Sequence, residues 1–176
     1  MSLKRNKITI KEIAVLGMLS ALMYASKVLM EVLPNIHLLG VFIVATTVVF
    51  RSKALFTIYT FAIISGLFSG FSPWWVPYLY IWTVLWLFTM LLPKKLPQKI
   101  APIIYMSVSA LHGFLYGVIY APAQAILFGL DFKGTIAWII AGLPFDLTHG
   151  ISNFICGLLI VPIIKVLERT QKIISN

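Results

Sequence analysis

Residues 145–167 read FDLTHGISNFICGLLIVPIIKVL. This apolar run is long enough to cross a bilayer, which takes about 20 residues of helix. Because the run is continuous rather than alternating, and because a helix satisfies its own backbone in lipid, it predicts a membrane helix. Asp146, His149 and Asn153 nevertheless fall within about 60° of one another on that helix, with Gly150 and Gly157 on the same side. The opposite face is aliphatic and suits lipid; it comprises Ile151, Ile155, Leu158 and Leu159.

The whole chain has the composition of a membrane protein. Hydrophobic residues make up 60% of its 176 residues and charged residues only 11%, and the mean hydropathy is +0.98. We therefore expect an all-α integral membrane protein with a single domain over residues 1–176. Six apolar runs predict six transmembrane helices in one compact bundle, near 12–33, 36–50, 54–71, 75–92, 100–121 and 145–167.

The segment 122–144 is too polar and too broken to cross the membrane in this prediction. We expect a folded outer loop, with a short apolar piece at 135–143 that lies over the site. The residues that interrupt the segment are Gly129, Asp131, Lys133, Gly134 and Pro144.

Lysine and arginine residues predict the orientation of the bundle. In a six-helix arrangement, 12 of the 14 basic residues fall on one side, which the positive-inside rule identifies as the cytoplasm. Both termini are then cytoplasmic. The net charge of +9 is spread over helix ends, so we expect no nucleic-acid partner. These residues are Lys4, Arg5, Lys7, Lys11, Arg51, Lys53, Lys94, Lys95, Lys99, Lys165, Arg169 and Lys172.

Two further helices present polar or aromatic faces. In the fifth, a face within about 80° carries Tyr105, Ser109, His112, Tyr116 and Tyr120; in the fourth, one side carries Trp75, Tyr78, Trp82 and Trp86. Aromatic surfaces combined with a few hydrogen-bonding groups are typical of a ligand pocket. The alternative is structural: Asp146 caps the last helix behind Pro144, and His149 and Asn153 join helices by hydrogen bonds.

The first helix carries a stripe of small residues, Ala14, Gly17, Ala21 and Ala25. Such a small-xxx-small pattern lets another helix approach closely, either within the same subunit or from a partner. Lys27 and Glu31 lie about 100° from the stripe, where they can pair or face a cavity.

Templates for catalysis and metal binding fit poorly. GLFSG at 66–70 is one residue too long for the GxSG of rhomboid-type proteases, and no Walker motif is present. The three histidines lack metal-ligand spacing, and Cys156 is the one cysteine. We expect no enzyme activity, no metal and no cofactor; an integral-membrane enzyme that uses Asp146 and His149 is the alternative.

The chain resembles, along its whole length, the substrate-binding S components of energy-coupling factor (ECF) vitamin transporters. The resemblance rests on GMLSALMYA in the first helix, LPNIHLLG before the second, WWVPYLYIWT in the fourth and PFDLTHGISN in the last. It implies a subunit in the bacterial cytoplasmic membrane that binds a vitamin from outside with high affinity. Its partners would be a membrane coupling subunit and two cytoplasmic ATPases, and transport would involve toppling of the S component.

The resemblance also implies roles for particular residues. Gly17, Ala21 and Ala25 would contact the coupling subunit. The pocket, lined by helices four to six near the outer surface, would include Asn35, Trp75, Tyr78, Trp82, His112, Tyr116, Asp146, His149 and Asn153.

The pocket residues contain one carboxylate and no arginine, which favours a mostly neutral ligand over a dianion such as folate. The aromatic fourth helix resembles the branch of the family that takes cobalamin, so cobalamin or a cobamide fragment is the expected substrate. Pyridoxine, pantothenate and a queuosine precursor remain alternatives.

Overall fold

The structure is a computed structural model that describes residues 8–33 and 35–175. Lys4, Arg5 and Lys7, which belong to the predicted cytoplasmic terminus, lie outside the described residues. Within the described part of the chain every regular element is helical, as the composition predicts.

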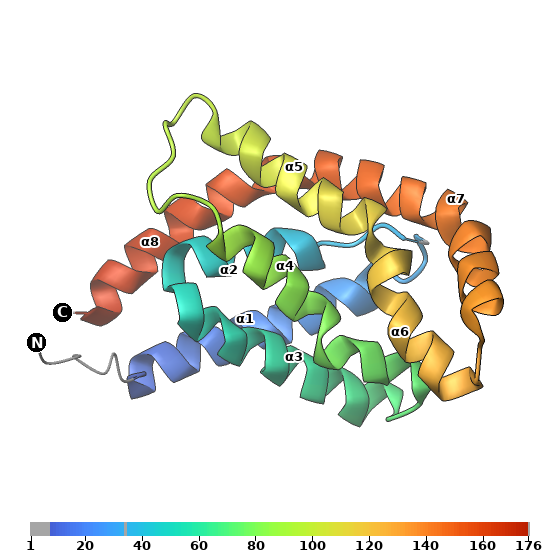
Figure 1. The fold of residues 1–176 in the computed structure, drawn as a ribbon. Coiled ribbons are helices and arrows are strands. Elements are labelled where there is room, and N and C mark those ends of the chain that lie inside the picture. Colours follow the sequence, from blue (N-terminus) through green and yellow to red (C-terminus); the bar gives the residue numbers. More distant parts are fainter. Residues whose placement is uncertain (1–7, 34, 176) are drawn as a thin grey trace, which may run out of the picture.

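Eight α-helices and three short 3₁₀ segments follow one another along residues 8–33 and 35–175 (Figure 1). They are α1 (Ile10–Leu29), α2 (Leu39–Phe50), η1 (Arg51–Lys53), α3 (Ala54–Ser69), η2 (Pro73–Leu79), α4 (Ile81–Met90), α5 (Ala101–Phe114), α6 (Tyr116–Phe128), α7 (Phe132–Cys156), η3 (Gly157–Leu159) and α8 (Ile160–Ser175).

Four helical stretches of the described chain are long and apolar enough to cross a membrane. They are Ile10–Leu29, Leu39–Ser69, Ala101–Phe128 and Phe132–Ile174. The multi-pass membrane character predicted from the composition is thus compatible with the helices that form.

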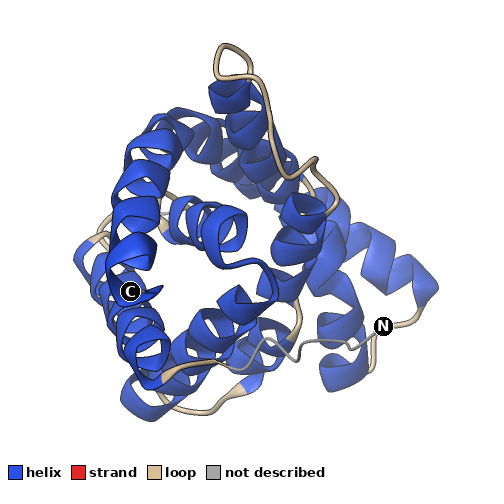
Figure 2. Ribbon diagram, turned by 90° about the vertical axis from the view of Figure 1, so that its left-hand side faces the viewer, coloured by secondary structure: helices blue, strands red, loops and turns tan. Residues whose placement is uncertain are grey.

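The bundle is built around α2. This helix packs against α1, α3, α4, α5, α7 and α8, and most of its residues are buried. Figure 2 shows the bundle end-on, with helices on all sides of its centre. The start of α1, η1, the connection from α4 to α5 and the end of α8 lie at one end of the molecule. The described basic residues of the predicted cytoplasmic side therefore gather at that end.

The chain reverses at η1. Arg51, the residue that follows α2, has a positive φ of 54°, and α3 runs back from η1 along the bundle (Figure 1). The Arg51 guanidinium donates to the carbonyl of Met90 at 3.1 Å, and the Trp86 indole donates to the carbonyl of Arg51 at the same distance. These two bonds tie the turn to α4.

The prediction of a loop at 122–144 is wrong. Helix α6 continues to Phe128 and α7 begins at Phe132, so only three residues between them are outside a helix. Pro122 and Pro144 lie inside these helices, which membrane helices tolerate when neighbours satisfy the freed backbone groups. The piece 135–143 is the first half of a long helix rather than a separate segment.

Polar residues in this region mark a tight turn between two helices. Gly129 ends α6 in the left-handed conformation, with φ 64°, which glycine adopts at little cost. Asp131 then caps α7, because its Oδ1 accepts from the backbone N–H of Gly134 at 2.7 Å.

The predicted fourth and fifth spans are also divided. Residues 73–79 form a 3₁₀ segment that contains Pro73 and Pro77, and α4 proper begins only at Ile81. Residues 100–121 fall into α5 and α6, which meet at Leu115.

Helices α5 and α7 approach most closely where each has a glycine. A Cβ built on Gly113 would lie 2.8 Å from the Cα of Gly150, which is too close for any side chain. Nearby, Asn153 Nδ2 donates to the carbonyl of Ser109 at 3.2 Å. This glycine crossing brings the polar face of α7 against α5.

The two faces predicted for residues 145–167 are confirmed by their burial. Asp146, His149, Asn153, Gly150 and Gly157 are all buried. Exposed side chains lie on the other side, namely Ile151, Ile155, Leu158 and Leu159.

Replacement of Gly113 by alanine should destabilise the fold by about 1 to 3 kcal/mol, because the new methyl group meets backbone that cannot move aside cheaply. Thermal unfolding in detergent measures the effect. Gly142→Ala on α7 is the matched control, since nothing lies within 4 Å of its Cβ position and helical alanine is favoured. Equal melting temperatures for the two variants would contradict the close crossing.

Candidate functional site

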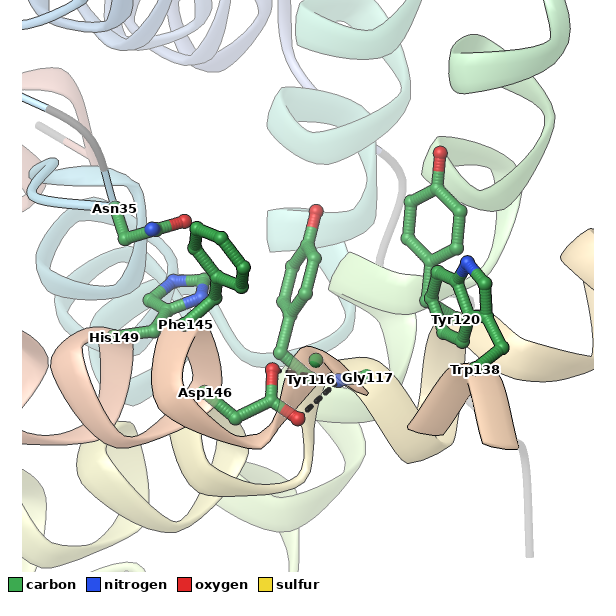
Figure 3. A pocket seen from close by; sticks show the side chains of 9 residues that line it. Asn35, Tyr116, Gly117, Tyr120, Trp138, Phe145, Asp146 and His149 are labelled. Atoms are coloured by element: carbon green, nitrogen blue, oxygen red, sulfur yellow. Dashed lines mark hydrogen bonds between the residues drawn. The ribbon is translucent and has the colours of Figure 1, made fainter. Parts of the chain in front are cut away.

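A cavity of about 190 Å³ lies at the end of the bundle away from the gathered basic residues. It is formed by the loop before α2, the first turns of α6 and the middle of α7 (Figure 3). Its walls are aromatic and polar, and comprise Asn35, Tyr116, Gly117, Tyr120, Trp138, Gly142, Phe145, Asp146 and His149.

Four of the residues predicted for the pocket line this cavity: Asn35, Tyr116, Asp146 and His149. Asn35 has a positive φ of 61°, a conformation that asparagine adopts more readily than most residues. The left-handed turn helps to place its side chain beside His149 (Figure 3).

Asp146 holds the start of α6. Its two carboxylate oxygens lie 3.0 and 3.1 Å from the backbone nitrogen of Gly117, which donates to them (Figure 3). The first N–H groups of a helix have no hydrogen-bond partner within the helix. A carboxylate there also interacts favourably with the positive end of the helix dipole. Asp146 therefore stabilises the break between α5 and α6.

The alternative prediction, that Asp146 caps the last helix, is right about capping and wrong about which helix is capped. Asp146 is a cap, but it caps α6, and it lies deep inside its own helix α7. Gly117 is required for this contact, since a Cβ there would overlap the carboxylate.

Behind the cavity wall lies a cluster of rings in mutual contact. Tyr116 and His149 have ring centroids 4.6 Å apart, and His37 and His149 are equally close. Trp82 contacts Tyr116 at 6.0 Å, His112 at 5.8 Å and His37 at 6.0 Å. We call these five rings, from Trp82, Tyr116 and the three histidines, the ring cluster.

Four nitrogen atoms of the ring cluster are buried without a hydrogen-bond partner in the described part of the chain. They are Trp82 Nε1, His37 Nδ1, His112 Nδ1 and His149 Nε2. Buried polar groups in native proteins are nearly always paired, because an unpaired one costs about 1 to 3 kcal/mol. Because four such atoms lie together, the ring cluster is the candidate site for a polar partner.

Burial disfavours a charge on the rings of the cluster. Burial, together with the nearness of His112, lowers the pKa of His37, in the loop before α2, to about 4. Among the described residues no carboxylate hydrogen-bonds any of the three imidazoles, and an ion buried without a counter-charge is strongly disfavoured.

A second hollow of about 180 Å³ lies on the other side of the loop before α2. It shares Asn35 with the first, and Lys27, Glu31, His37 and Tyr78 are among its lining residues. Lys27 Nζ is 3.9 Å from the Glu31 carboxylate, so the two charges that the sequence placed one turn apart do pair.

Two predicted pocket residues lie away from the cavity. The Trp75 indole donates to the carbonyl of Ala62 at 2.7 Å and packs on Phe71. Asn153 lies deeper in the bundle, where its Nδ2 donates a hydrogen bond to the carbonyl of Ser109. Tyr78 lines the second hollow, while Trp82 and His112 belong to the ring cluster.

The sequence did not predict several lining residues. Trp138 and Gly142 were missed because their segment was expected to be a loop, although it does lie over the site. Tyr120 lies on the polar face of the predicted fifth span, and His37 lies within the motif LPNIHLLG. Both could therefore have been predicted from the sequence. No sequence pattern indicated that Gly117 and Phe145 would line the cavity.

Comparisons of the chain with protein-family models, with curated proteins and with solved structures found no match.

Asn153 and His149 should respond differently to substitution. Asn153→Ala should lower the free energy of unfolding by about 1 kcal/mol, because it removes the bond to Ser109. His149→Phe keeps the ring packing and breaks no hydrogen bond through Nε2, so stability should stay near wild type while affinity for a ligand falls.

Thermal unfolding of the ligand-free protein and equilibrium binding, measured on both variants, separate the two roles. If His149→Phe unfolds much earlier than wild type and binds as well, His149 is a packing residue.

Proposed function

We propose that this chain is the substrate-binding subunit of an ECF-type importer in the bacterial cytoplasmic membrane. It captures a small vitamin or cofactor precursor from outside and passes it on through a membrane coupling subunit and two ATPases. The observation that carries the proposal is the aromatic cavity, backed by unpartnered ring nitrogens, at the end of the bundle away from the basic residues. A cavity with aromatic walls and a few polar groups inside a membrane protein is typical of a ligand site.

The proposal includes six crossings with both termini in the cytoplasm. The apolar stretch Leu39–Ser69 contains two helices because the chain reverses at η1, and η2 with α4 forms one more passage between α3 and α5. Helix α2 is short for a crossing, but its position inside the bundle shields its ends from lipid.

Cysteine accessibility tests this topology. In a Cys156→Ser background, cysteines at the exposed positions Ser52 and Gln98 should react with membrane-impermeant reagent only after the cells are opened. Cysteines at the exposed positions Ser72 and Lys133 should react in intact cells. Reversed labelling would place the cavity on the cytoplasmic side and contradict capture from outside.

The small-residue stripe of α1 is free to meet a partner. Ala14, Ala21 and Ala25 are exposed, and nothing lies within 4 Å of the Cβ position of Gly17. Packing within the subunit, the alternative for this stripe, uses instead Leu16, Leu19 and Met23 on the other side of α1. An exposed strip of small side chains suits close contact with a helix of a coupling subunit.

Ala25→Trp should abolish most uptake while ligand binding by the purified subunit stays at the wild-type value, because the indole keeps the partner helix away from α1 and leaves the cavity untouched. Radiolabelled uptake and equilibrium binding provide the two readouts. Leu22→Trp, at a position beside the stripe that is also exposed, should transport normally. Normal uptake by Ala25→Trp would remove the stripe from the proposal.

The same variants give a test that needs no ligand. The tagged wild-type protein, purified from its own membranes, should bring down the coupling subunit and the ATPases, and Ala25→Trp should not.

Catalysis by Asp146 and His149, the alternative function, gains no support from their geometry. Both Asp146 oxygens accept from Gly117, and no hydrogen bond joins Asp146 to His149. A general acid and base working as a pair need such contact, directly or through water.

A further inference from the structure

We infer that the ligand enters the cavity with an uncharged, planar nitrogen heterocycle of one or two fused rings that carries both hydrogen-bond donors and acceptors. This inference rests on the proposed binding function and names the class of molecule that the site selects.

The unpartnered nitrogens set the hydrogen-bond pattern. Trp82 Nε1–H can only donate. His112 Nε2 lies 2.9 Å from the carbonyl of Ile81 and so carries the proton, which leaves Nδ1 as an acceptor. His37 Nδ1 and His149 Nε2 can each take either role, according to tautomer. A ligand that pairs both Trp82 Nε1 and His112 Nδ1 must therefore bring one acceptor and one donor.

The walls set the shape. His149 and Tyr116 both line the cavity, and their rings lie 4.6 Å apart at 50°. At the mouth, Tyr120 and Trp138 stack with centroids 5.7 Å apart and planes inclined by 24°. Surfaces of this kind favour a flat ring that offers its faces to aromatic side chains and its edge to the nitrogens.

The volume limits the size. A closed apolar cavity of about 150 Å³ accommodates a ring the size of benzene. The cavity here, about 190 Å³ and partly open, has room to enclose a group of one or two fused rings. A whole corrinoid exceeds the drug-sized molecules that occupy pockets of about 300 to 1,000 Å³, so only a ring-sized fragment of cobalamin fits.

Tyr116 controls the path to the deeper nitrogens. Its ring lines the cavity and also contacts Trp82 and His112. A ligand therefore reaches these two rings by displacing one aromatic side chain, while His149 stands at the cavity itself.

Charge excludes anionic ligands from the ring cluster. The carboxylate at the cavity, Asp146, accepts a hydrogen bond from the backbone N–H of Gly117. Lys27 lines the second hollow instead, where it pairs with Glu31. An acid such as pantothenate would find no cation among the lining residues of the first cavity. Among the alternatives left by the sequence, pyridoxine, a queuosine precursor and a benzimidazole fragment of a cobamide all belong to the inferred class.

Binding to the purified protein in nanodiscs tests the inference. The probes are benzimidazole, pyridoxine and hypoxanthine as uncharged heterocycles, naphthalene as a flat hydrocarbon of the same size as benzimidazole, and pantothenate and cyanocobalamin as the excluded classes. We expect at least one heterocycle to bind. If benzimidazole binds, it should bind more tightly than naphthalene.

Trp82→Phe and its matched control Trp86→Phe test the hydrogen-bond donor. Each substitution replaces an indole on α4 by a phenyl ring and so removes one N–H group. The Trp86 N–H donates to the carbonyl of Arg51, whereas the Trp82 N–H has no partner in the described chain. Trp82→Phe should weaken binding of the heterocycle by roughly 5- to 150-fold and reduce its advantage over a hydrocarbon of equal size. Trp86→Phe should bind as the wild type does and lose stability.

Each outcome decides between the two proposals. Binding of cyanocobalamin or pantothenate, with no heterocycle bound, overturns the inferred class and leaves the binding function standing. Equal loss of affinity in Trp82→Phe and Trp86→Phe overturns the assigned donor role and with it the inference. Failure of every probe, with no coupling subunit recovered from membranes, overturns both proposals.

Discussion

The site depends on the crossing of α5 and α7 at Gly113 and Gly150. With no side chain between them, the backbones meet, and the polar face of α7 is pressed against α5 and the start of α6. Asp146 can then reach Gly117, Asn153 can reach Ser109, and His149 can contact Tyr116. Larger residues at the crossing would separate all three pairs at once, because they lie along the same helix.

Indole groups illustrate the difference between structure and function in this bundle. Trp75 and Trp86 donate to backbone carbonyls and so fix η2 and the η1 turn. Trp82 is more deeply buried than either and has no acceptor in the described chain. A fold selected for stability alone would pair or replace such a group. Under the proposed binding function, this unpaired indole is a candidate partner for the ligand.

Two surfaces of the chain serve two different proposed partners. The cavity and the ring cluster behind it gather buried polar atoms from the loop before α2 and from α4 to α7, whereas the small-residue stripe is an exposed strip on α1 alone. A substitution in one surface can therefore be made without touching the other. That separation would allow the proposed binding and the proposed transport to be measured independently in the same protein.

The sequence by itself determined the helical class, the membrane character and the two faces of residues 145–167, because hydropathy and helical periodicity are local properties. It also identified Tyr116, Asp146 and His149, which share faces with other polar residues. Tertiary structure decided that residues 122–144 are helical except for the turn at 129–131, since Pro122 and Pro144 are tolerated only where neighbouring helices pack. It also decided that Asp146 caps α6 and that Trp75 lies outside the site, because the partners of these side chains come from elements distant in sequence.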